Sequence, residues 1–178
     1  MNVPNKLTLA RVCMIPFFLF FLLNTSVPYG KYIAVVIFIL ASLTDTLDGY
    51  IARKYNLITN FGKFMDPLAD KLLVSSALIC FVQMGLVPAW IIVIIISREF
   101  IISGFRLVAS DSGIVIAASY WGKIKTVSQM VMAILLIIHV DNPVYAVMEQ
   151  SFIYIALVLT VISLVDYVWK NRQVLDTK

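Results

Sequence analysis

The chain is built from six long hydrophobic stretches, separated by short segments that are polar or carry proline and glycine. A helix that crosses the hydrocarbon core of a bilayer needs about 20 mainly apolar residues. The pattern therefore predicts six transmembrane helices with short connections. The stretches are Leu7–Leu23, Tyr32–Ile51, Leu68–Met84, Ala89–Val108, Ile124–Val140 and Val144–Val168. Because the chain shows no repeat of fixed period and no low-complexity tract, we predict a single membrane domain over residues 1–178.

The amino-acid composition agrees with this prediction. Hydrophobic residues make up 61% of the chain and charged residues 13%, whereas soluble domains average about 45–50% and about 25%. The mean hydropathy is +0.95. These values exclude a water-soluble globule, a disordered chain and a disulfide-linked scaffold. We expect an all-α integral membrane protein that crosses the bilayer several times.

The basic residues predict how the helices are oriented. With a cytoplasmic N-terminus, 13 of the 14 lysines and arginines fall on the inner side and only Lys31 falls outside, in agreement with the positive-inside rule. Both termini are then cytoplasmic. The net charge of +4 reflects orientation in the cell membrane more than binding to nucleic acid. Trp90, Trp121 and Trp169 lie near predicted helix ends, where tryptophan anchors helices at the interface. His139, the one histidine, is expected at an outer helix end.

The acidic residues are few and concentrated. Of the ten aspartates and glutamates, four fall within 26 residues, at two predicted helix ends on the cytoplasmic side. Around the first pair, five residues follow the spacing i, i+3, i+4, i+7 and i+8, which places them on one face of a helix. This acidic stripe consists of Asp45, Asp48, Gly49, Ala52 and Arg53.

The second pair of aspartates opens the next predicted helix. Asp66 and Asp70 are four residues apart and share one face of that helix. Pro67 is best tolerated in the first helical turn, so we expect Asp66 at or beside the start of the helix. The short connection from Arg53 to Gly62 then lets the two acidic faces turn toward each other.

Four carboxylates in a partly desolvated site repel one another and require cations nearby. A network of ion pairs with lysines and arginines is one solution, and bound divalent metal is the one we favour. The segment carries no histidine or cysteine, so its hard oxygen ligands suit Mg²⁺, or Mn²⁺, rather than zinc. Two ions held by four aspartates resemble the two-metal sites that catalyse phosphoryl transfer.

The other members of the acidic stripe fit a bound phosphate compound. Gly49 and Ala52 remove side-chain bulk and let a ligand approach the backbone, although close helix packing is an alternative use of small residues in membranes. Arg53 offers a bidentate donor to a phosphate. Its alternative role is to anchor the helix on the inner side of the membrane.

The complete segment, Asp45-x2-Asp48-Gly49-x2-Ala52-Arg53-x8-Gly62-x3-Asp66-x3-Asp70, resembles the signature of the CDP-alcohol phosphatidyltransferase family. Its eight fixed residues and every gap between them match that signature. The flanking segments are similar to bacterial family members that make phosphatidylglycerol phosphate. These segments are Pro4–Arg11, Ser97–Phe100, Gly122–Thr126 and Gln129.

The resemblance implies a reaction and a role for each residue of the signature. The four aspartates would bind two divalent ions that hold the pyrophosphate of CDP-diacylglycerol, and Asp70 would also be the general base. Asp48, Gly49, Ala52 and Arg53 would line the nucleotide pocket, with Thr8 and Thr59 beside them. The 1-hydroxyl of sn-glycerol 3-phosphate would attack the phosphorus attached to diacylglycerol, releasing CMP and leaving phosphatidylglycerol phosphate in the bilayer. The family also implies a homodimer.

The acceptor, glycerol 3-phosphate, is a dianion near neutral pH, so its pocket is expected to hold cations. Arg98 lies deep enough in its predicted span to be costly in lipid, and Arg106 falls on roughly the same side of that helix. Lys123 and Lys125 open the next predicted helix at the same level. We take these four as candidates. Ion pairing between Arg98 and Glu99, and ordinary anchoring at the inner leaflet, are the alternatives.

Three other functions are compatible with parts of this pattern: a sibling transferase, an ion transporter and a non-catalytic scaffold. A sibling transferase that uses inositol phosphate or serine would carry the same signature. Carboxylates in membranes also mark ion pathways, but transport sites tend to lie near the midplane between related repeats. Here the predicted carboxylates gather at one edge and no repeat is evident, so we favour an enzyme over an ion transporter or a non-catalytic scaffold.

Overall fold

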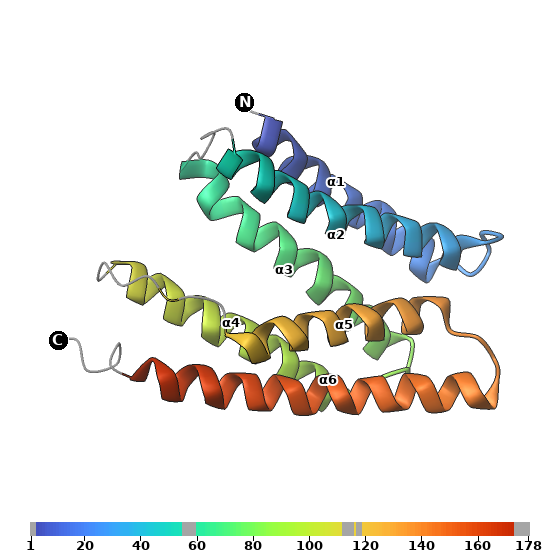
Figure 1. The fold of residues 1–178 in the computed structure, drawn as a ribbon. Helices are drawn as coiled ribbons and strands as arrows, with labels where there is room; N and C mark the ends of the chain where they lie inside the picture. Colours follow the sequence, from blue (N-terminus) through green and yellow to red (C-terminus); the bar gives the residue numbers. More distant parts are fainter. Residues whose placement is uncertain (1–2, 55–59, 112–115, 117–118, 173–178) are drawn as a thin grey trace. The chain divides into compact units, whose positions relative to one another are not determined.

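The computed structural model describes residues 3–54, 60–111, 116 and 119–172; for residues 3–5, 45–54, 60–64, 66, 67, 70, 110 and 111 it describes the backbone only. This described part is all-helical (Figure 1). Each helix overlaps one of the six predicted hydrophobic stretches, which confirms the predicted all-α class. They are α1 (Val3–Leu23), α2 (Gly30–Lys54), α3 (Asn60–Gln83), α4 (Ala89–Asp111), α5 (Tyr120–Ile138) and α6 (Pro143–Lys170).

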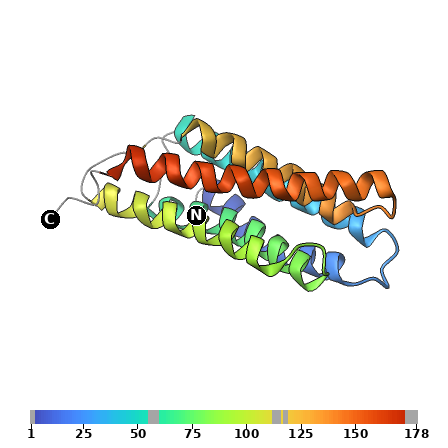
Figure 2. The ribbon, with the colours of Figure 1, turned by 90° about the horizontal axis from the view of Figure 1, so that it is seen from below.

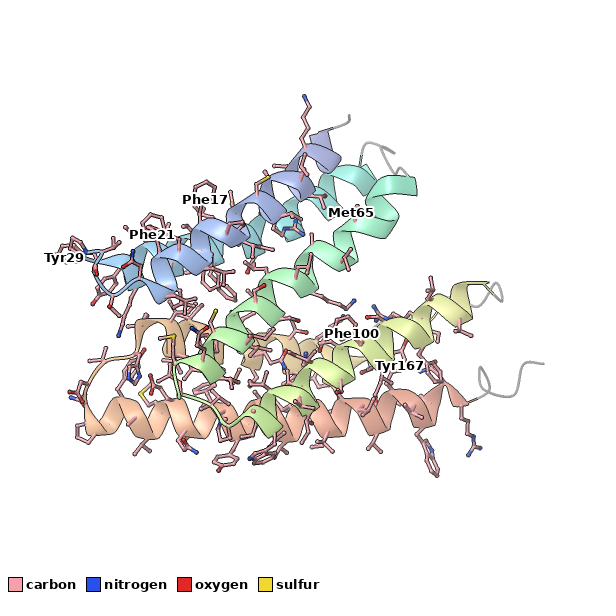
Figure 3. All side chains as sticks on the ribbon, turned by 180° about the vertical axis from the view of Figure 1, so that it is seen from behind. Phe17, Phe21, Tyr29, Met65, Phe100 and Tyr167 are labelled. Atoms are coloured by element: carbon pink, nitrogen blue, oxygen red, sulfur yellow. The ribbon has the colours of Figure 1, made fainter. Side chains whose placement is uncertain are left out.

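Three of these helices are long and apolar enough to cross a membrane: α1 from Lys6 to Leu23, α5 and α6. In the described part, α2 and α3 carry shorter apolar segments, Gly30–Thr44 and Lys71–Gln83. Large hydrophobic side chains are also exposed on the helix surfaces. Figure 3 shows Phe17 and Phe21 projecting from α1, and Phe17 is 62% exposed. Exposed apolar surface on long apolar helices is typical of membrane proteins, in which lipid covers it.

The chain divides into two compact units, residues 1–83 and 84–178. In the N-terminal unit, α1 packs against both α2 and α3, whereas α2 and α3 share fewer close contacts (Figure 1). Phe18 of α1 and Phe38 of α2 are fully buried, with ring centroids 5.8 Å apart. The buried Ala34 and Ala41 lie two turns apart on α2 and permit close packing there.

The turn between α1 and α2 depends on a glycine. A Cβ atom at Gly30 would lie 2.8 Å from the carbonyl oxygen of Phe21. This contact is with backbone, so a substitution must shift the end of α1. The preceding residue, Tyr29, has a positive φ of 61°, which further tightens the reversal of the chain.

We therefore predict that Gly30→Ala lowers the apparent thermal unfolding midpoint, with a cost of about 1–3 kcal/mol because the added methyl group overpacks this turn. Gly104→Ala in α4 is the matched control, since a Cβ there meets nothing within 4 Å. Alanine favours a helix over glycine, so the control is expected to keep or raise the midpoint. Equal midpoints for the two variants would contradict the close approach at Gly30.

In the C-terminal unit, α6 packs against α5 and α4 (Figure 2). One face of α6 is buried, and its members recur at intervals of three and four residues: Glu149, Ile153, Ala156, Thr160, Ser163 and Tyr167. The polar members are small or reach a partner. Thr160, for example, donates a hydrogen bond to the carbonyl oxygen of Ala156. This face brings polar atoms of α6 into the interior of the unit.

The ends of α5 and α6 are closed by local hydrogen bonds. Ser119 caps the start of α5 by accepting from the amide of Gly122 at 3.1 Å, and Asn142 caps α6 by accepting from Val144 at 2.8 Å. His139 ends α5 in the left-handed conformation, so its predicted place at a helix end is confirmed. Trp90, Trp121 and Trp169 likewise lie within two residues of helix ends.

One predicted boundary is wrong. Helix α3 begins at Asn60, so Asp66 is its seventh residue and does not lie at the helix start, and Pro67 falls inside the helix. The prediction treated proline as confined to a first turn. Apolar helices tolerate interior proline when the freed backbone groups are satisfied in other ways. The same chain shows this in α1, where Pro16 also lies inside the helix.

Candidate active site

The acidic stripe belongs to one uninterrupted helix, because α2 continues to Lys54. The backbone positions 45, 48, 49, 52 and 53 therefore follow helical spacing, as predicted. Positions 66 and 70 likewise share a face of α3. Thr59 lies outside the described residues. For seven other predicted site residues only the backbone is described: Asp45, Asp48, Gly49, Ala52, Arg53, Asp66 and Asp70.

The connectivity brings these segments to one end of the N-terminal unit. Helix α2 ends at Lys54 and α3 begins at Asn60, and Figure 1 shows these two helix ends at the same end of the unit. Figure 1 shows the start of α1 at this same end. Among the described side chains no three His, Cys, Asp or Glu residues gather in a way that could hold a metal. The side chains of the four predicted aspartate ligands lie outside the described part, so the metal site stays a prediction.

Helix α1 contributes two buried polar side chains near this end. Thr8, a predicted site residue, and Arg11 are each 1% exposed and lie three residues apart on one face of α1. A buried arginine in an apolar unit is costly unless anionic or polar groups surround it. From the sequence, Arg11 is placed on the inner side of the membrane and in the flanking segment Pro4–Arg11, and no role is predicted for its side chain. Its spacing from Thr8 is the signal that identifies it as a member of the same polar face.

The C-terminal unit holds a buried polar cluster that includes two predicted acceptor residues. Arg98 donates from Nη1 to Glu99 Oε1 at 3.1 Å, and Lys125 Nζ contacts the same carboxylate oxygen. Arg98 Nη2 donates to Ser163 Oγ of α6. We call Arg98, Glu99, Lys125 and Ser163 the Arg98 cluster. The pairing of Arg98 with Glu99, raised as an alternative from the sequence, is therefore present, and it links Arg98 with Lys125.

The other two predicted acceptor residues lie apart from these contacts. Arg106 is exposed and donates from Nε to the hydroxyl of Tyr167 at 3.3 Å, with its guanidinium carbon 5.9 Å from that ring's centroid. Tyr167 belongs to α6, and its side chain is buried on the side of α6 that faces α4 (Figure 3). Lys123 is exposed at the start of α5. The structure thus brings Arg98 together with Lys125, and Arg106 together with Tyr167.

Four buried side-chain atoms of this unit have no hydrogen-bond partner within the described residues: the donors Arg98 Nε, Ser128 Oγ and Gln129 Nε2, and the acceptor Asp166 Oδ2. Lys125, Ser128 and Gln129 follow the spacing i, i+3, i+4 and are buried on one face of α5. A buried donor without a partner is destabilising by about 1–3 kcal/mol. These donors therefore retain capacity for a polar ligand. Ser128 and Ser163 were missed from the sequence, because lone serines on apolar helices carry no signal of their own.

The described part is all-helical, and three of its helices are apolar enough to cross a membrane, which is typical of an integral membrane protein. A model of the CDP-alcohol phosphatidyltransferase family matches residues 1–162. The chain belongs to this family of transferases. The match extends over residues of both compact units, and the family resemblance read from the signature is confirmed.

Curated relatives carry specific names. The chain is 45% identical to the CDP-diacylglycerol–glycerol-3-phosphate 3-phosphatidyltransferase of Bacillus subtilis, over 99% of this chain and 98% of that protein. It is 41% identical to the enzyme of the same name from Haemophilus influenzae, over 93% and 91% of the two chains. A probable phosphatidylglycerophosphate synthase of Mycobacterium tuberculosis is 40% identical, over 94% of this chain and 80% of that protein.

Proposed function

We propose that this chain transfers the phosphatidyl group of CDP-diacylglycerol to sn-glycerol 3-phosphate. The products are phosphatidylglycerol phosphate and CMP. The observation that carries the proposal is the 45% identity, over 99% of the chain, to a relative named for this reaction. A sibling transferase acting on inositol phosphate or serine shares the signature, but the relatives cited above are named for glycerol 3-phosphate or for phosphatidylglycerophosphate.

In the proposed mechanism the 1-hydroxyl oxygen of glycerol 3-phosphate attacks the phosphorus that bears diacylglycerol. The new P–O bond forms as the bond to the CMP phosphate oxygen breaks, and the hydroxyl proton passes to the Asp70 carboxylate. Arg53 and Thr8 orient the nucleotide, with Thr59 beside them. Gly49 and Ala52 leave room for it against α2.

Asp45, Asp48, Asp66 and Asp70 are the residues that would hold two divalent cations, Mg²⁺ or Mn²⁺. Their carboxylate oxygens are the hard ligands that these ions prefer, and their backbone positions fall on one face of α2 and one face of α3, at the same end of the unit. Bound there, the ions supply stabilisation of the negative charge on the pyrophosphate and on the departing CMP.

Residues of the C-terminal unit bind the acceptor in this proposal. The phosphate of glycerol 3-phosphate carries two negative charges, and the cations that bind it are Arg98, Arg106, Lys123 and Lys125. Arg98 contributes most, since its buried Nε is a donor with no partner among the described atoms. A buried guanidinium binds a phosphate more strongly than an exposed lysine, because water competes less.

We further propose six transmembrane helices with both termini in the cytoplasm, and a site at the inner edge of the cell membrane. The distribution of lysine and arginine supports this orientation. Acyl chains of the lipid substrate then stay in hydrocarbon while its nucleotide and the acceptor approach from the cytosol. We propose that residues 1–178 act as one domain and, by resemblance to the family, that two copies form a homodimer.

The decisive assay measures CMP release by purified protein in lipid nanodiscs, with CDP-diacylglycerol and a panel of alcohols. We predict turnover with glycerol 3-phosphate and Mg²⁺, and a loss of at least about 100-fold when EDTA removes the metal. Readdition of Mg²⁺ or Mn²⁺ is the control and restores activity. If CMP were released with inositol phosphate or serine but not with glycerol 3-phosphate, that alcohol would be the acceptor in place of glycerol 3-phosphate. Full activity in EDTA would show that the reaction does not need bound divalent metal.

A further inference from the structure

Glu99 is shared by two buried cations on different helices. Its Oε1 atom accepts from Arg98 Nη1 at 3.1 Å and also contacts Lys125 Nζ of α5. Arg98 and Lys125 side chains are 8% and 2% exposed, and the Glu99 side chain is 23% exposed. The carboxylate is thus the anionic centre of the Arg98 cluster.

The charges explain why this centre is needed. Two cations buried near each other repel and lose the solvation of bulk water, so each requires an anionic or polar partner. One carboxylate compensates one of the two charges. Together the three ionised groups carry a net charge of +1, and a net positive charge in a buried site favours an anionic ligand.

Glu99 also links helix α4 to helix α5. Helices α4 and α5 each pack against α6, but in the described part they share few close backbone contacts with each other. The Glu99–Lys125 ion pair therefore sets the position of the Lys125 ammonium relative to α4. Ser163 of α6 holds the other side of the Arg98 guanidinium. Together these contacts fix both cations from three helices.

We propose that Glu99 is a positioning residue for the acceptor: it holds Arg98 and Lys125 so that both act on the phosphate of a phosphorylated alcohol. This inference rests on the proposed function. Glu99 does not touch the substrate in this role. It acts through the two cations, and a Glu99 variant should therefore resemble a Lys125 variant in its effect on the acceptor.

The first test is Glu99→Gln, which keeps the shape of the side chain and removes its charge. We expect the KM for glycerol 3-phosphate to rise on the order of tenfold or more, the effect of losing one charge-assisted hydrogen bond. The KM for CDP-diacylglycerol and the kcat at saturating acceptor should change less than about threefold. Glu99→Asp retains the charge and should recover part of the acceptor affinity.

Glu149→Gln is the matched control. Glu149 is also a buried carboxylate of this unit paired with a basic group, His139 Nδ1 at 2.9 Å. It lies 14 residues before Ser163 on α6, which corresponds to about 21 Å along a helix. We expect this variant to leave both KM values unchanged. If Glu99→Gln behaved like Glu149→Gln, or lowered kcat and raised both KM values together, Glu99 would have no positioning role.

A double-mutant comparison then asks whether Glu99 acts through Lys125. We expect Lys125→Met to raise the KM for glycerol 3-phosphate, and the addition of Glu99→Gln to raise it by less than about threefold more, because coupled residues are not additive. If the double variant raised the KM by the product of the two single effects, Glu99 and Lys125 would act independently, and the proposal that Glu99 acts through Lys125 would be wrong.

A binding measurement separates this proposal from the proposed function. Glycerol 3-phosphate should raise the unfolding midpoint of the wild-type protein, by linkage, and this rise needs no turnover. We expect the rise to be lost in Glu99→Gln and kept in Glu149→Gln. An equal rise in Glu99→Gln would overturn the role of Glu99. A wild-type protein that binds glycerol 3-phosphate but releases no CMP would instead overturn the proposed function.

Discussion

Replacing Asp70 by asparagine is expected to reduce the kcat for CMP release by about 1,000-fold or more while CDP-diacylglycerol still binds. General-base catalysis contributes about 10²–10⁴-fold, and the amide of asparagine cannot accept the hydroxyl proton. It keeps one carbonyl oxygen that can ligate a metal, so the nucleotide site should survive. Single-turnover release of CMP gives the rate, and the rise in unfolding midpoint with CDP-diacylglycerol gives binding.

Asp141→Asn is the control for this variant. It makes the same chemical change at an exposed aspartate between α5 and α6, and it should keep full activity. If Asp70→Asn retained more than about a tenth of wild-type turnover, Asp70 would not be the base. If instead it lost CDP-diacylglycerol binding completely, its main role would be to hold metal.

Replacing both arginines of α4 by lysine is expected to raise the KM for glycerol 3-phosphate by about 10- to 100-fold. Hydrogen bonds to charged groups contribute about 1.5–3 kcal/mol, and lysine keeps the charge but lacks the planar, forked donor set of arginine. In Arg98→Lys the ammonium cannot reach Glu99, Ser163 and a ligand in the geometry that Arg98 uses. Arg106→Lys removes the Nε donor to Tyr167.

Arg172→Lys is the matched control for the arginine pair. Arg172 is exposed near the end of α6, where its guanidinium lies 5.4 Å from the ring centroid of Trp169. We expect the control to leave the KM for both substrates unchanged. An unchanged acceptor KM in the Arg98→Lys, Arg106→Lys double variant would mean that α4 does not bind the acceptor, and the acceptor pocket would have to be sought elsewhere.

Hydrophobic stretches were sufficient to predict the helices of the described part, because a long apolar run in a membrane protein has few other structures to adopt. Helix α4 begins at Ala89, the residue at which its hydrophobic stretch begins. The start of α3 was predicted several residues too late. The rule that confines proline to a first turn is derived from helices in water, and Pro67 does not end a helix here.

The site was predictable only in part. Aspartate spacing along α2 and α3 is local information, so those faces could be derived from the sequence. Local spacing also allowed the Arg98–Glu99 pair to be raised from the sequence. The contacts of Arg98 with Ser163 and of Glu99 with Lys125 could not be predicted, because these partners are 65 and 26 residues apart in the chain. Which helix packs on which depends on the summed packing of many apolar side chains, and periodicity alone does not determine it.

The proposed mechanism requires that the acidic faces of α2 and α3 turn toward each other and hold divalent cations. Anomalous scattering from crystals of the protein grown with Mn²⁺ and CDP-diacylglycerol tests it most directly. We predict two manganese peaks between the helices, each about 2.0–2.3 Å from carboxylate oxygens of Asp45, Asp48, Asp66 or Asp70. Aspartates that point apart, or that pair with lysine and arginine while no manganese lies between them, would contradict the account.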